Sequence, residues 1–312
     1  MFDNLPSEVR IKEVGPRDGL QNEKVFVPTE VKKEFIRKLA DAGLKYIEIT
    51  SFVHPKWIPA LADGHEIGSE FCNMEGVTTN ALVPNMKGLE GAEKAGMKVA
   101  SLFMSATESH NKANINRTIS ETLKQFEELI PSAKKLGMKV TTGLSTVFGC
   151  PFEGDVDVDQ VVSIVKAQLD MGADEVGIAD TIGVANPLQV KRVLEKVLKL
   201  APADKFGVHF HDTEGTAVVN SVSALEMGIT RFDGAVGGLG GCPYAPGATG
   251  NVPTEHLVFA FEKMGVKTGV DHQKLLDAGE FIQGVLGRTL DSNGLRAYIG
   301  RRKRAEEKAA AS

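Results

Sequence analysis

The sequence is poor in cysteine and contains no long hydrophobic run. Its 312 residues include only three cysteines, and so small and odd a number argues against a disulfide framework. Cys72 and Cys150 are expected to be packing residues, whereas Cys242, in a glycine-rich segment, is a candidate reactive thiol. No apolar stretch approaches the roughly 20 residues that span a membrane. We therefore expect no membrane-spanning segment.

An excess of positive charge is also lacking. The chain has 36 basic and 41 acidic residues and a formal net charge of −5, which argues against a nucleic-acid groove. The first ten residues show neither the charged-then-apolar pattern of a secretory signal nor an arginine-rich transit pattern, so we expect a cytoplasmic protein. The length fits one large α/β barrel or two ordinary domains.

A cadence of helical pattern, glycine and short apolar run recurs along the chain. Glycine favours the left-handed position just past the end of a helix. The runs that follow are of strand length and mostly apolar on both faces, as buried parallel strands are. The five glycines that mark this cadence are Gly43, Gly96, Gly137, Gly172 and Gly228.

Three more strand-like runs, at residues 9–14, 76–82 and 205–210, bring the predicted strands to about eight. Helical patterns alternate with them, which predicts a parallel sheet. Eight strands in a chain of this length suit a (β/α)8 TIM barrel, with an open doubly wound sheet as the structural alternative. The glycines at 237–241 do not have the spacing of a dinucleotide fingerprint.

Local signals predict where some helices begin and end. Thr118 and Glu121 form a capping box that opens a helix, and Pro131 is expected to break or kink that helix. We expect a single barrel domain over residues 1–290 with a C-terminal helical extension. Residues 291–312 are expected to be a tail whose end is solvated or frayed, a basic interaction patch at its arginines being the less favoured alternative.

Polar side chains gather at the carboxyl ends of the predicted strands. In a barrel of this type those ends form the active-site face, so the side chains should converge. They are Arg17 and Asp18 after the first strand, Glu48 in the second, Asp180 after the sixth, His209 and His211 in the seventh, and Cys242, Asn251 and Glu255 after the eighth.

The pair His209 and His211 is a candidate metal site. Residues two apart in a strand point to the same side, so both imidazoles can bind one ion, although a pair of hydrogen-bonded histidines is the simpler explanation. Asp18 and Asn251 would add oxygen ligands from other strand ends. Two nitrogens, two oxygens and open positions suit Mg²⁺ or Mn²⁺, and Zn²⁺ is a further candidate because histidine suits it.

Other candidates each have a structural and a chemical interpretation. Arg17 can form a local salt bridge or present a fixed cation to a developing oxyanion. Glu48 interrupts an apolar strand, and a buried carboxylate is costly unless paired, so a partner such as Arg17 is expected. Asp180 can cap the following turn or support the site. Cys242 can be inert or can exchange a proton when its loop closes.

Beyond these separate signals, the chain resembles the 3-hydroxy-3-methylglutaryl-CoA lyases, with matching segments in family order over most of its length. The narrowest matches are RDGLQNE and GGLGGCPYAPG; RDG with HxH alone would indicate only the wider group of metal-dependent barrels that act on acyl-CoA thioesters. The segments are VGPRDGLQNE, TSFVHPKW, LVPNMKG, ANIN, FGCPFEG, ADTIG, HFHDT and FDGAVGGLGGCPYAPGATGN.

The resemblance implies cleavage of 3-hydroxy-3-methylglutaryl-CoA to acetyl-CoA and acetoacetate, usually in leucine breakdown, by an enzyme that is commonly a homodimer. It implies a divalent cation, Mg²⁺ or Mn²⁺, bound by Asp18, His209, His211 and Asn251. Arg17 would polarise the thioester oxygen and Cys242 would assist proton transfer. Glu48 and Glu255 would support the site, and the base for the C3 hydroxyl would be Asp18, His209 or a water.

Two alternatives stay open. Many relatives carry Gly-Tyr where this chain has Thr142 and Gly143, which allows a substrate with a longer C3 alkyl group. A synthase that forms the bond, as in the isopropylmalate and homocitrate synthases, is the other alternative, and the segment GGCPYAPG favours the lyase over it.

Overall fold

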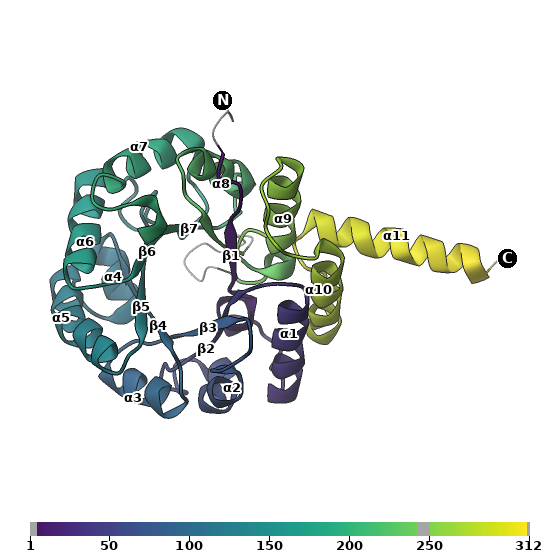
Figure 1. The fold of residues 1–312 in the computed structure, drawn as a ribbon, viewed down its shortest axis with the longest axis horizontal. Helices are drawn as coiled ribbons and strands as arrows, with labels where there is room; N and C mark the ends of the chain where they lie inside the picture. Colours follow the sequence, from purple (N-terminus) through teal and green to yellow (C-terminus); the bar gives the residue numbers. More distant parts are fainter. Residues whose placement is uncertain (1–4, 242–249, 311–312) are drawn as a thin grey trace.

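The computed structural model describes residues 5–241 and 250–310, and its centre is a closed barrel of eight parallel strands in sequence order (Figure 1). Pairing of β1 with β8 closes the barrel, so the TIM-barrel prediction is confirmed and the open-sheet alternative is wrong. The strands are β1 Arg10–Glu13, β2 Tyr46–Ser51, β3 Thr78–Leu82, β4 Val99–Ser105, β5 Lys139–Ser145, β6 Glu175–Asp180, β7 Phe206–Phe210 and β8 Arg231–Gly234.

Helices surround the barrel, and α11 extends away from it (Figure 1). They are α1 Thr29–Asp41, α2 Gly64–Phe71, α3 Met86–Lys94, α4 Glu108–Ile115, α5 Ile119–Lys135, α6 Val158–Asp170, α7 Pro187–Val197, α8 Ala217–Glu226, α9 Thr254–Lys263, α10 His272–Leu286 and α11 Asn293–Ala310. Short helical turns occur at Gly15–Gly19, Pro59–Leu61, Ala203–Lys205 and Val236–Gly238. No helix in residues 5–241 or 250–310 is long and apolar enough to cross a membrane.

The predicted helix signals are mostly confirmed. All five cadence glycines have positive φ, as the left-handed position after a helix requires. Thr118 and Glu121 form the capping box at the start of α5. Pro131 does not break the helix as one form of its prediction required, because α5 continues through it to Lys135. Leu129 and Ile130, completely buried beside Pro131, hold the helix against the barrel and offset the roughly 3 kcal/mol cost of an interior proline.

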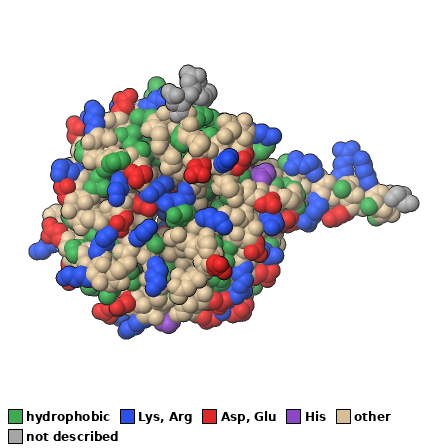
Figure 2. Space-filling model, in the orientation of Figure 1, with side chains coloured by type: hydrophobic (Ala, Val, Ile, Leu, Met, Phe, Trp, Pro, Cys, Tyr) green, Lys and Arg blue, Asp and Glu red, His purple; other side chains and the backbone are tan. Residues whose placement is uncertain are grey.

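The C-terminal helical extension is present as α11. Residues 301–310 are helical and exposed, so the expectation of a solvated end is confirmed over this range. Figure 2 shows the segment protruding from the body with lysine and arginine side chains along it. Only the first part of the helix packs: Leu295 is buried, and Tyr298 and Ile299 contact the core.

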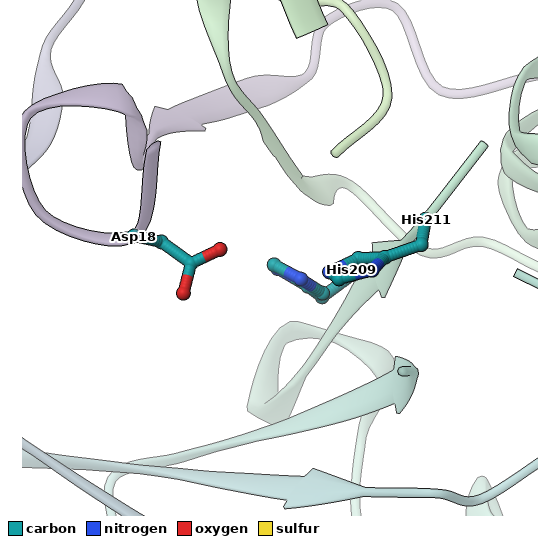
Figure 3. Close-up of side chains that lie close together, drawn as sticks. All are labelled: Asp18, His209 and His211. Carbon is teal, nitrogen blue, oxygen red and sulfur yellow. The ribbon is translucent and has the colours of Figure 1, made fainter. Parts of the chain in front are cut away.

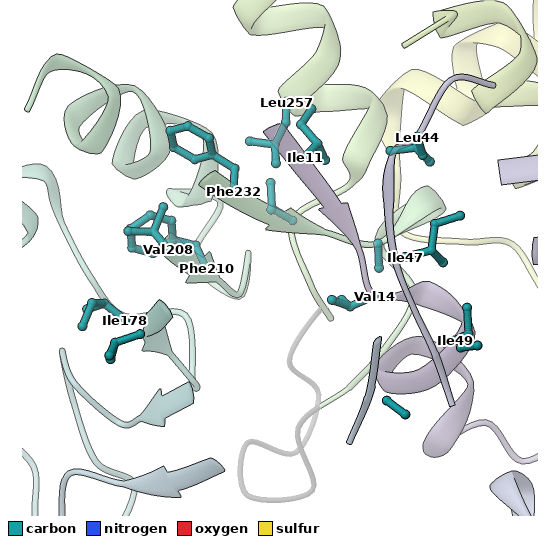
Figure 4. Packing of buried hydrophobic residues seen from close by; sticks show 14 of the residues in the cluster. Ile11, Val14, Leu44, Ile47, Ile49, Ile178, Val208, Phe210, Phe232 and Leu257 are labelled. Atoms are coloured by element: carbon teal, nitrogen blue, oxygen red, sulfur yellow. The ribbon is translucent and has the colours of Figure 1, made fainter. Parts of the chain in front are cut away.

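Outward side chains of the strands form the core between barrel and helices (Figure 4). Ile11, Val208 and Phe232 are buried in this layer, and the Phe232 ring lies 4.7 Å from that of Phe261 in α9. Inward side chains are mostly polar. They line a cavity of about 760 Å³ that extends from Arg10, near the amino ends of the strands, to His211 at the carboxyl ends.

Candidate active site

The carboxyl ends of the strands bring Asp18, His209 and His211 together (Figure 3). One potential ligand atom from each of the three lies within 4.8 Å of the others. His209 is in β7, His211 directly follows it, and Asp18 comes from the turn after β1, from which its carboxylate points toward the histidine rings. This is the juxtaposition expected from the sequence.

Asn251 lies beside this cluster. Its Nδ2 donates to Oδ2 of Asp18 at 2.8 Å and to the carbonyl of Leu239 at 2.9 Å. Within the described part of the chain, Oδ1 of Asn251 and Nδ1 of His211 are buried and have no hydrogen-bond partner. Unpaired buried polar atoms are costly, and an amide oxygen and an imidazole nitrogen are both metal ligands. The four side chains therefore fit a divalent cation.

The protonation states of the cluster also suit a cation. Burial opposes ionisation of Asp18, but Arg17, His209 and His211 outweigh it and lower the pKa of Asp18 to about 2. Burial, and then the neighbouring His209, lower the pKa of His211 to about 4. At neutral pH the cluster thus offers an ionised carboxylate and a neutral imidazole, the forms that bind metals.

Arg17 is held at the edge of the cluster by two carboxylates. Its Nη1 donates to Oδ1 of Asp18 at 2.7 Å and its Nε to Oε2 of Glu48 at 2.6 Å, and Nη2 also pairs with Glu48. Asn80 donates to the other oxygen of Glu48 at 2.9 Å. The expected partner for the buried Glu48 is therefore confirmed. The guanidinium lines the cavity with its orientation fixed by both pairs.

The turn that carries Arg17 and Asp18 is anchored by Glu13, a residue that the sequence analysis missed. This buried carboxylate accepts hydrogen bonds from the backbone N–H groups of Gly15 and Val236, at 2.8 and 3.1 Å, and from the Thr254 hydroxyl at 2.6 Å. Burial raises the pKa of Glu13 to about 7. Glu13 thus joins the turn after β1 to the segment after β8.

The carboxylates of two predicted supporting residues accept hydrogen bonds from backbone N–H groups. Both carboxylate oxygens of Glu255 accept from the N–H of Gly237 at 3.1 Å, which supports the segment leading to Asn251. Asp180 is completely buried and accepts from the N–H groups of Val184 and Ala185 at 3.1 and 2.8 Å. Its carboxylate caps the turn after β6, as one of its two interpretations predicted, and its carbonyl accepts from the N–H of His211 at 3.2 Å, so its supporting role stays a prediction.

Two of the three cysteines, Cys72 and Cys150, lie among the described residues. Cys242 lies outside the described residues, so its predicted role stays a prediction. Cys150 is buried and accepts a hydrogen bond from the Thr107 hydroxyl at 3.1 Å, consistent with a packing residue. Cys72 is half-buried and contacts the carbonyl of Ser69.

Lys12 and Asp233 are the other residues that the sequence analysis missed. Oδ2 of Asp233 lies 2.8 Å from Nζ of Lys12 and 3.3 Å from Nδ1 of His209. Burial opposes ionisation of Asp233, but Lys12 and His209 outweigh it and lower its pKa. The available signal was alternation: Arg10 and Lys12 flank the apolar Ile11, and Arg231 and Asp233 flank the apolar Phe232, which places the charged residues on the opposite face, toward the lumen.

Comparison with known proteins identifies the family. The HMGL-like family model matches residues 8–282. The hydroxymethylglutaryl-CoA lyase YngG of Bacillus subtilis is 51% identical over 94% of this chain and 98% of its own length. A solved B. subtilis HMG-CoA lyase structure superposes with a TM-score of 0.92 at 51% identity, covering 94% of this chain and 99% of that one.

A second solved structure shows an HMG-CoA lyase of Acinetobacter baumannii in complex with coenzyme A and 3-methylmalate. It is 38% identical, has a TM-score of 0.89, and the match covers 93% of this chain and 95% of that one. The matches extend over the whole barrel, including the strand ends that carry the cluster. The chain therefore belongs to the HMGL-like family, the 3-hydroxy-3-methylglutaryl-CoA lyases.

Proposed function

We propose that this protein cleaves 3-hydroxy-3-methylglutaryl-CoA to acetyl-CoA and acetoacetate with the help of a divalent cation. The observation that carries the proposal is the cluster of Asp18, His209 and His211 at the barrel mouth, with Arg17 fixed beside it. Membership of the lyase family supports the substrate, and the coenzyme A complex of a relative supports an acyl-CoA ligand.

The reaction breaks the C2–C3 bond of the substrate. A proton leaves the C3 hydroxyl, a carbonyl forms at C3 to give acetoacetate, and the bond's electron pair becomes the enolate of acetyl-CoA. A proton then adds to C2. The reaction therefore needs a group that makes the hydroxyl acidic, a base that accepts its proton, a group that stabilises the enolate oxygen and a donor that protonates C2.

Asp18, His209, His211 and Asn251 would hold the cation, and its chemistry is to lower the pKa of the C3 hydroxyl. A carboxylate, an amide oxygen and two imidazoles suit Mg²⁺ or Mn²⁺, and of the two we expect Mn²⁺ to bind more tightly. The low pKa of Asp18 makes it a weak base, and His209 has no free lone pair while it binds the cation, so a water is favoured as the acceptor of the hydroxyl proton.

Arg17 would bind the thioester oxygen. Its guanidinium keeps its charge, lines the cavity and is pinned by Asp18 and Glu48, so little reorganisation is needed when negative charge develops on the enolate. The adjacency of Arg17 and Asp18 then has a physical reason: one anchored turn serves the thioester side and the cation side of the same breaking bond. We propose Cys242 as the proton donor to C2.

The test is a turnover assay on the purified protein with Mg²⁺ or Mn²⁺, following acetoacetate, with a chelator control. We expect turnover that the chelator abolishes and added cation restores. Turnover that persists in chelator would contradict the role of the cation. Release of thiol from acetyl-CoA and a 2-oxo acid, without lyase activity, would instead support the synthase.

A layer of glycines in the lumen favours a second candidate substrate, one with a longer alkyl group at C3. Gly143, Gly177 and Gly207 pair in register across β5, β6 and β7 and all line the cavity. No side chain fills this part of the lumen from these three positions. A higher kcat/KM for a longer 3-alkyl analogue than for the methyl substrate would support this candidate; a lower value would exclude it.

We also propose a cytoplasmic homodimer. Sedimentation equilibrium tests the assembly, with a mass near twice the 33.5 kDa of the chain as the expected result. Fractionation of the native cells tests the location.

A further inference from the structure

Three charged or polar side chains from adjacent strands lie side by side on the lumen face of the barrel at the candidate cation site. Lys12 in β1 pairs in register with Asp233 in β8, and Asp233 pairs in register with His209 in β7. Register partners on parallel strands lie side by side and point to the same face, here the lumen. The contact of Asp233 with both neighbours therefore follows from strand register.

The carboxylate of Asp233 is fixed between two nitrogens. Its Oδ2 lies 2.8 Å from Nζ of Lys12 and 3.3 Å from Nδ1 of His209. All three side chains are largely shielded, with exposures of 30% for Lys12, 19% for Asp233 and 18% for His209. A shielded carboxylate accepts hydrogen bonds and does not donate, so Nδ1 of His209 should carry a proton.

We propose that Asp233 is a positioning residue for the cation site: it holds His209 in the tautomer whose Nε2 lone pair is available to the metal. The inference rests on the proposed function, because it needs a divalent cation at Asp18, His209 and His211. Carboxylates that accept from the second nitrogen of a metal-binding histidine fix its ring and raise metal affinity. Lys12 holds the carboxylate in place from the other side.

His211 provides an internal contrast. Within residues 5–241 and 250–310, its Nδ1 has no hydrogen-bond partner, so no neighbour selects its tautomer. Asp233 therefore preorganises one of the two imidazoles, while His211 is oriented by its place in the backbone bridge to Asn251.

The competing explanation is that Lys12 and Asp233 form an ion pair that only stabilises the barrel. Glu175 offers a matched control for that explanation. It is another carboxylate of the same lumen, paired with Arg10 at 2.8 Å and with Arg231 at 2.6 Å, and it lies in β6 without contact to the cluster. A structural role predicts similar effects of Asp233→Asn and Glu175→Gln on cation binding.

The experiment titrates metal-free full-length protein with Mn²⁺, using electron paramagnetic resonance to count free ion. We expect Asp233→Asn to raise the Mn²⁺ Kd by about 10- to 100-fold, the usual effect of losing such a partner. Glu175→Gln should stay within about twofold of the wild type. Equal Kd values for the two variants would overturn the proposal.

A second readout follows the tautomer directly. Long-range proton–nitrogen NMR spectra of the metal-free wild type should place the His209 proton on Nδ1. In Asp233→Asn the new amide can donate to Nδ1, so the proton should move to Nε2. A wild-type proton on Nε2 would overturn the proposal even if the variant does not fold. A wild type that binds no Mn²⁺ while showing the expected tautomer would overturn the cation in the proposed function, and the metal-positioning role with it.

Discussion

Replacement of Arg17 by lysine tests the oxyanion role most directly, because it keeps the charge and removes the geometry. The guanidinium uses Nε and Nη2 for Glu48 and Nη1 for Asp18. A lysine ammonium is one point charge and cannot bridge both carboxylates while facing a thioester oxygen. The positive charge should therefore be displaced from the position where the enolate oxygen forms.

The expected loss can be estimated from oxyanion sites in general. Removing one preorganised donor costs about 10²- to 10³-fold in kcat, equivalent to about 2.7–4 kcal/mol of transition-state stabilisation. We expect Arg17→Lys to lower kcat by this amount while changing KM less than about threefold, because the enolate charge exists only in the transition state and intermediate.

The assay measures steady-state acetoacetate formation over a range of substrate concentrations. Arg10→Lys is the matched control: Arg10 also lies in the lumen and pairs with Glu175, but at the opposite end of the cavity from the cluster. It should retain activity within about threefold. A Mn²⁺ titration of Arg17→Lys separates the binding of the thioester oxygen by Arg17 from the binding of the cation by Asp18. We expect the variant to retain cation binding. Near-normal turnover of Arg17→Lys, or a loss fully explained by lost cation, would refute the reasoning.

Three further predictions concern the cation, the anchor and the core. Asp18→Asn removes the ionised ligand, and we expect at least a tenfold higher Mn²⁺ Kd by titration; an unchanged Kd would exclude Asp18 as a ligand. Glu13 binds protons more tightly when folded, with a pKa of about 7 against 4.5, so wild-type stability should fall by up to about 3 kcal/mol as pH rises from 4.5 to 7. The Glu13→Gln variant should lack this pH-dependent change in the free energy of unfolding, measured by urea denaturation. A pH profile identical to that of the wild type would contradict the role assigned to Glu13. Phe232→Ala should cost about 3–5 kcal/mol in the same assay because the ring is buried against Phe261, and a cost below about 1 kcal/mol would show that the layer repacks freely.

Much of the architecture could be predicted because its signals are local. Glycine after a helix, a short apolar run, and the capping residue Thr118 are each properties of a few consecutive residues. The helix break expected at Pro131 does not occur. The local cost of a proline in a helix was outweighed by burial of Leu129 and Ile130 against the barrel, which no local rule contains.

The candidate site, like the fold, could be predicted from the sequence only in part. Asp18, His209 and His211 could be brought together from sequence, because carboxyl ends of parallel strands meet on one face once the barrel is assumed. For Asp180 the same rule left two interpretations, a cap for the following turn or support of the site, and the structure shows that its carboxylate caps that turn.

Sequence alone thus indicated about eight strands alternating with helices, favoured a TIM barrel over an open sheet and marked the strand ends at which chemistry can occur, since these depend on periodicity and on residue types at strand ends. The sequence also suggested Arg17 as the partner of Glu48, but only the tertiary structure revealed the partners of Asp233 and Glu13. The contact of Asp233 with His209 and Lys12 requires the register of three strands, two of which are the first and the last of the barrel, and the contacts of Glu13 require closure of the barrel. Register and closure are properties of the assembled sheet, because they arise from packing between segments that are distant in the chain.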